Sequence, residues 1–62
     1  MLTHFWDADG NDLHLVSLET DGTFEIGETI EIHSNPYLVE RVDHKVTTAG
    51  NKSLHIFVSE QR

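Results

Sequence analysis

Residues 28–46 have the sequence ETIEIHSNPYLVERVDHKV, and they contain the clearest structural signal in the chain. In the first part of this stretch, Ile30 and Ile32 alternate with polar residues. This period of two is typical of a β-strand with one buried face and one solvated face. Residues 34–36 (Ser-Asn-Pro) then predict a turn, because all three residue types are enriched in turns.

The apolar residues after this turn do not keep a single period. Tyr37 and Val39 share one face of an extended chain, whereas Val42 and Val46 share the opposite face. One extra residue near positions 40–41 reconciles the two halves, because a bulge shifts the register of a strand by one residue. The sequence therefore predicts a β-bulge or a sharp bend at this point.

Turn signals divide the whole chain into five runs of strand length. The runs are rich in Val, Ile, Leu, Thr and aromatic residues, as strands are, and no window favours a helix longer than one turn. We predict an all-β fold: a small five-stranded antiparallel barrel or curled meander that forms a single domain over residues 1–62. The predicted strands are Leu2–Trp6, Leu13–Glu19, Glu28–Ser34, Tyr37–Val46 and Leu54–Ser59.

Two neighbouring stretches resemble small SH3-like β-barrel proteins. In Phe24–Ile32 (FEIGETIEI), an aromatic residue precedes Gly, an acidic residue and alternating aliphatic residues. After a turn, Tyr37–Val42 (YLVERV) has the pattern Tyr-x-Val-x-x-Val. The resemblance covers about a third of the chain and implies an SH3-like barrel architecture. This fold occurs in proteins of translation, chromatin and phage assembly, so the resemblance implies no activity.

Charge is distributed unevenly along the chain. The formal net charge is −7, and the first 40 residues contain nine Asp or Glu and no Lys or Arg. Such a surface repels a phosphate backbone, so we expect no direct binding of DNA or RNA. An acidic surface suits a basic partner, and one function it suggests is an acidic inhibitor that mimics nucleic acid and blocks a basic DNA-binding protein.

The sequence gives no indication of a membrane, secreted or redox-active protein. There is no cysteine, so disulfides and thiolate zinc sites are excluded. The longest apolar runs are far too short to cross a bilayer, and no secretory signal pattern opens the chain. We therefore expect a cytoplasmic protein without membrane contact.

An acidic stretch early in the chain partly matches a calcium-binding loop. Asp7, Asp9 and Asn11 have the spacing of the first three ligands of such a loop. The position that requires glycine is Asp12, however, and the position of the bidentate glutamate is Leu18. We therefore expect an acidic turn without a metal ion.

The chain is also rich in histidine, which binds transition metals and titrates near neutral pH. No two histidines have the spacing of a metal-ligand pair within one strand. Cross-strand pairing brings histidines together only in a register that the sequence does not fix. Because His44 shares a face with Val42 and Val46, we expect it to be partly buried and bonded to the backbone. The five histidines are His4, His14, His33, His44 and His55.

Catalytic motifs are missing from the sequence. Asp43 and His44 are adjacent, so on a strand they point to opposite faces and do not pair. The four glycines are dispersed and form no phosphate-binding loop. A chain of 62 residues also leaves little volume for an enclosed pocket. We expect no enzymatic activity and no cofactor.

Several large apolar residues do not fit on the inward face of a strand. Phe5 and Trp6 are consecutive, and Phe57 alternates with two inward residues. Bends and bulges that tuck these side chains into the core are one explanation. The other is an exposed apolar surface that meets a partner or a second copy. The predicted interaction residues are Phe5, Trp6, Leu18 and Phe57.

Three functions agree with these features. The first is a small interaction or structural module that self-associates or binds another protein, and this is the function that we predict. The second is the acidic inhibitor described above. The third is a metal- or pH-responsive histidine protein.

Overall fold

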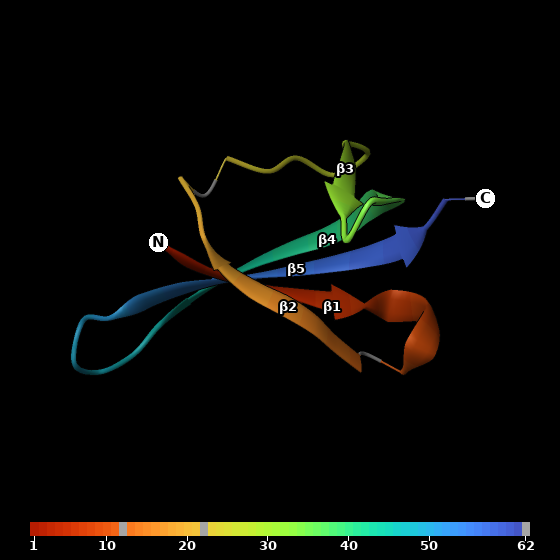
Figure 1. Cartoon of the computed structure of the whole chain (residues 1–62). Coiled ribbons are helices and arrows are strands. Elements are labelled where there is room, and N and C mark those ends of the chain that lie inside the picture. The colour runs from red at the N-terminus through yellow and green to blue at the C-terminus, as the bar shows by residue number, and fades with distance from the viewer. Residues whose placement is uncertain (12, 22, 62) are drawn as a thin grey trace.

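The computed structural model describes residues 1–11, 13–21 and 23–61, and it contains one curled five-stranded sheet (Figure 1). The predicted all-β fold class is confirmed, and each of the five predicted runs overlaps one observed strand. A 3-10 helix, η1 (Ala8–Gly10), follows the first strand. The strands are β1 (Leu2–Asp7), β2 (Leu13–Glu19), β3 (Thr29–Ile32), β4 (Asn35–Val46) and β5 (Lys52–Glu60).

The strands are arranged in the order β2-β1-β5-β4-β3, so β2 and β3 form the two edges of a half-barrel. The antiparallel prediction holds for β1–β2, β3–β4 and β4–β5. It is wrong for β1 and β5, which pair in parallel. These two strands are the first and last of the chain, so no short hairpin connection forces them to run in opposite directions.

The predicted bulge in β4 is confirmed. Val39 lies opposite Val58 and Arg41 lies opposite Phe57, which leaves Glu40 as the extra residue on β4. The extra residue reverses the alternation of the strand. Val39 is buried on one side of this point, and Val42 packs against the same core on the other side.

A second bulge lies in β2 and was not predicted. Phe5 pairs with Val16 and Trp6 pairs with His14, so Leu15 is the extra residue on β2. As a result, Leu15 and Val16 both pack against the core, although they are consecutive in sequence.

The turn before β4 lies earlier than predicted. Ile32 pairs with Asn35, so residues 33–34 form a two-residue hairpin loop, and Pro36 already belongs to β4. His33 and Ser34 have φ values of 51° and 67°, and positive φ at both positions is the requirement of a type I′ turn. This turn matches the right-handed twist of the strands it joins, which accounts for its position. Asp12, at the glycine position of the calcium-loop pattern, and Gly22, one of the four dispersed glycines, lie outside the described residues.

The core lies on the concave face of the sheet. The inward residues of β5, Leu54, Ile56 and Val58, are each 0% exposed, as their alternation predicts. Phe5 of β1 is 3% exposed and meets the ring of Phe24 edge-on at 5.5 Å. Phe24 belongs to the connection between β2 and β3, which therefore packs against the open side of the half-barrel. The opposite face of β2, β1, β5 and β4 remains uncovered by this connection.

Candidate functional site

The convex face of the sheet gathers three histidines that are far apart in sequence. His4 of β1 pairs in register with His55 of β5. On the other side of β1, His4 pairs with Ser17 and Trp6 pairs with His14 of β2. All these side chains lie on the face opposite the core because strand residues alternate between faces. The sequence alone did not indicate this group, since it depends on the parallel β1–β5 pairing and on the bulge at Leu15.

The rings of His4, Trp6, His14 and His55 are in mutual contact, and we call them the histidine–tryptophan cluster. His4 stacks on His55 with 4.9 Å between ring centroids. The indole of Trp6 contacts His14 edge-on at 5.1 Å and stacks on His55 at 6.1 Å. His4 and His14 lie 6.1 Å apart. The cluster therefore connects three strands, from the edge strand β2 to the central strand β5.

Hydrogen bonds fix the orientation of each ring in the cluster. Nε1 of Trp6 donates to Nδ1 of His55 at 3.1 Å, and Nε2 of His55 lies 3.2 Å from Oγ of Ser53. On the other side, Oγ of Ser17 lies 2.7 Å from Nδ1 of His4 and 2.7 Å from Nε2 of His14. Because a hydroxyl carries one hydrogen, at least one of these two imidazoles donates to Ser17.

Charge and burial act together on His55. Burial lowers the pKa of His55 below its ordinary value, since the charged form loses solvation, and the positive charges of Lys45 and His4 lower it further. The carboxylate of Asp43, which pairs with His55 across β4–β5, acts in the opposite direction. The net result favours the neutral imidazole.

A cation and an aromatic ring extend the cluster towards β4. The guanidinium of Arg41 lies over the ring of Phe57, with 3.9 Å from its central carbon to the ring centroid. Nε of Arg41 also lies 3.2 Å from a carboxylate oxygen of Asp43. Phe57 is next to Trp6 in the register of β1 and β5. The convex face thus carries aromatic and imidazole rings together with the Arg41–Asp43 ion pair.

The four predicted interaction residues do not form one surface. Phe5 lies in the core, so its side chain is not available to a partner. Trp6 and Phe57 are neighbours on the convex face and are partly exposed. Leu18 is 50% exposed and lies on the edge strand, opposite the buried Thr3. The physical reason is the alternation of β1, which sends the adjacent Phe5 and Trp6 to opposite faces.

Four of the exposed large apolar residues lie on or directly before the paired strands β1 and β2. Met1, Leu2, Leu13 and Leu18 are large hydrophobic residues between 38% and 62% exposed, and all lie on or directly before β1 and β2. Ile26 and Val46 are also exposed but lie far along the chain, in the β2–β3 connection and at the end of β4. The edge at β2 therefore combines unpaired backbone with apolar surface.

The predicted acidic turn is present at residues 7–11. The Asp7 side chain accepts a hydrogen bond from the backbone N–H of Asp9 at 3.0 Å and caps η1. Within the part of the chain that the structure describes, no group of three or more His, Cys, Asp or Glu side chains is arranged to hold a metal ion. His44 is exposed, so the prediction that it is partly buried is wrong; it lies beyond the bulge, near the end of β4.

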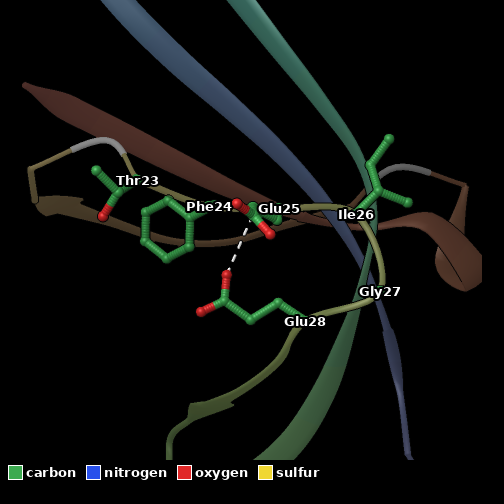
Figure 2. Close-up of a pocket in the computed structure, with 6 residues that line it drawn as sticks. All are labelled: Thr23, Phe24, Glu25, Ile26, Gly27 and Glu28. Atoms are coloured by element: carbon green, nitrogen blue, oxygen red, sulfur yellow. Dashed lines mark hydrogen bonds between the residues drawn. The ribbon is translucent and has the colours of Figure 1, made fainter.

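A shallow hollow of about 790 Å³ lies along the β2–β3 connection and is lined by residues 23–28. Figure 2 shows Glu28 turned back towards Glu25, whose backbone N–H donates to its carboxylate at 3.1 Å. No buried side-chain polar atom among the described residues lacks a hydrogen-bond partner. The hollow is therefore lined by the carboxylates of Glu25 and Glu28 beside the apolar side chains of Phe24 and Ile26.

Comparison of the chain with protein-family models, curated proteins and solved structures found no significant match. Within residues 1–11, 13–21 and 23–61, no helix is long and apolar enough to span a membrane.

Proposed function

We propose that this chain is a small interaction module that self-associates through the edge strand β2. One observation carries the proposal: the exposed apolar residues Leu13 and Leu18 lie on the same strand whose outer edge has no neighbour in the sheet. An edge strand offers backbone N–H and C=O groups that pair readily with another strand. Apolar side chains at that edge add a favourable burial term to the pairing.

The composition of β2 supports this assignment. Natural edge strands that avoid association carry Lys or Pro, and β2 (LHLVSLE) contains neither. The other edge strand, β3 (TIEI), carries no exposed large apolar side chain. The bulge at Leu15 distorts the first half of β2, so residues 16–19 form the regular part of the edge.

A second copy is the occupant that fits this edge. In a two-fold dimer, identical strands meet antiparallel, and the two sheets join into one continuous sheet. Antiparallel pairing centred on β2 keeps the two Glu19 carboxylates at opposite ends of the interface. The Glu19 carboxylate is already paired with the Met1 amino group at 2.6 Å, which reduces repulsion further. Trp6 then supports β2 from the convex face, and Leu18 is the interface residue.

The experiment compares two substitutions of exposed apolar residues. Leu18→Lys places a charge at the β2 edge, whereas Val46→Lys makes a matched change at the far end of β4, where Val46 is 64% exposed. Half-burial of one leucine contributes about 1 kcal/mol, so the loss in both copies amounts to about 2 kcal/mol. This is about a 30-fold weaker dimer. Light scattering after size exclusion, over a range of micromolar concentrations, measures the dissociation constant.

We expect a concentration-dependent dimer for the wild type and for Val46→Lys, and monomer for Leu18→Lys at the same concentrations. A wild type that stays monomeric at several hundred micromolar contradicts the proposal and favours the acidic inhibitor. Equal weakening by both substitutions also contradicts it, because the effect then does not depend on the β2 edge. Far-ultraviolet circular dichroism confirms that both variants keep the β fold.

We also propose that the half-barrel is of the SH3-like kind. The bulge at Glu40 supports this assignment, because a bulge bends β4 so that this one strand contributes to both halves of a curled sheet. An experimental structure with the same strand order tests this assignment, and a flat, unbent β4 would contradict it.

A further inference from the structure

The histidine–tryptophan cluster connects the edge strand β2 to β1 and β5 on the convex face of the sheet. Ser17 and His14 of β2 contact His4 and Trp6 of β1. The same two β1 residues stack on His55 of β5. On the convex face, the side-chain contacts of β2 with β1 are thus made through imidazole rings, a type of group that titrates near neutral pH.

The hydrogen bonds of the cluster require a neutral His55. An indole N–H only donates, so Nδ1 of His55 must accept from Trp6 and carries no proton. The ring proton is then on Nε2, which donates to Ser53. Protonation of His55 places an N–H against the indole N–H, and this contact breaks.

Charged and titratable groups surround His55 from every neighbouring strand. On β1, His4 stacks directly on it, so charges on both rings repel each other at 4.9 Å. On β4, Lys45 opposes a positive His55 and Asp43 favours one, while Asp43 is also engaged by Arg41. On β2, His14 lies behind Trp6 and adds a third imidazole. Asp43 is the only one of these named groups that favours the charged form.

We propose that the histidine–tryptophan cluster is a pH-sensitive latch. While His55 is neutral, its hydrogen bond holds Trp6 against His14 of β2; protonation of His55 in mildly acidic solution breaks this bond and loosens β2 from β1. Because β2 carries the interface residue Leu18, a loosened β2 pairs less well with a second copy. Self-association therefore weakens as the pH falls. This consequence rests on the proposed function, whereas opening of the latch is a property of the monomer.

The single tryptophan gives a direct readout, since Trp6 is the only one in the chain. At low micromolar concentration, we expect Trp6 emission to shift to longer wavelength between pH 8 and pH 5, as the indole leaves the cluster and becomes solvated. His55→Gln keeps an acceptor for Trp6 and a donor for Ser53 but does not titrate. This variant should reduce the emission change at least threefold. His44→Gln, outside the cluster, is the matched control and should titrate like the wild type.

An unchanged titration in His55→Gln, or its loss in His44→Gln, overturns the latch. Should His55→Gln lack the β-type spectrum, His55→Asn replaces it, because its amide oxygen also accepts from Trp6 and does not titrate. Amide hydrogen exchange gives a second test in the wild type. After correction for intrinsic rates, exchange in β2 should accelerate at least tenfold from pH 7.5 to 5.5, and exchange in β5 should accelerate less. Equal acceleration in both strands indicates global unfolding and contradicts a latch.

Light scattering at the two pH values separates the latch from the proposed function. A dimer at pH 7.5 that dissociates at pH 5.5 supports both. A dimer that persists at pH 5.5, with an emission change, contradicts the link between the latch and association. A monomer at both pH values overturns the proposed function. The titration of Trp6 emission then tests the latch by itself.

Discussion

Phe5 and Trp6 provide a matched pair of substitutions, because they are consecutive aromatic residues on opposite faces of β1. Phe5 is 3% exposed, packs in the core and meets Phe24 edge-on. Replacing a buried phenylalanine with alanine costs about 3–5 kcal/mol. Trp6 is partly exposed and loses mainly its hydrogen bond to His55 and part of its buried area, a cost of about 1–2 kcal/mol.

The difference is large relative to the stability of so small a chain. Typical stability per residue gives about 3–9 kcal/mol for 62 residues. Phe5→Ala should therefore remove most or all of the free energy of unfolding, whereas Trp6→Ala should remain folded. Far-ultraviolet circular dichroism and urea denaturation measure both. A folded Phe5→Ala together with an unfolded Trp6→Ala would mean that β1 faces the other way, and the convex cluster would not exist.

Two further predictions follow from backbone geometry and from titration. Gly27 has a φ of 91°, and no atom lies within 4 Å of a Cβ added at this position. Gly27→Ala should therefore lower the free energy of unfolding by about 1 kcal/mol, from backbone strain alone. Urea denaturation should show a lower midpoint, and an unchanged midpoint contradicts that geometry. The pKa of His55 is lower in the folded chain than in the unfolded chain, so the unfolded state binds the proton first as the pH falls. The contribution of His55 to the free energy of unfolding is therefore complete above about pH 6.5 and decreases below that pH. Urea denaturation at pH 7.5 and 5.5 should show this loss, and a higher stability at pH 5.5 contradicts the direction of the shift.

Local patterns predicted the elements of this fold well. Alternation identified the inward residues of β5, and the broken alternation between Val39 and Val42 located the bulge at Glu40. These features depend on neighbouring residues only. The hairpin loop was placed too late because Asn and Pro favour turns, whereas strand twist selects His33 and Ser34 with positive φ.

Non-local features were beyond sequence reasoning. The parallel β1–β5 pairing joins the two ends of the chain, and no turn residue specifies it. The histidine–tryptophan cluster depends on this pairing and on the bulge at Leu15, since a shift of one residue moves a side chain to the other face. The apolar residues that alternation left unexplained therefore divided three ways: Phe5 entered the core, Trp6 and Phe57 joined the convex face, and Leu18 remained at the edge.

The most direct test of self-association through β2 is amide hydrogen exchange at pH 7.5, measured at low and at high protein concentration. Strand pairing with a second copy buries the outer N–H groups of the edge strand, so protection in residues 16–19 should rise at high concentration. Protection in β3, the other edge, should stay the same and serves as an internal control. A rise in β3 alone, or no rise in β2 when a dimer is present, would place the interface elsewhere and contradict the account.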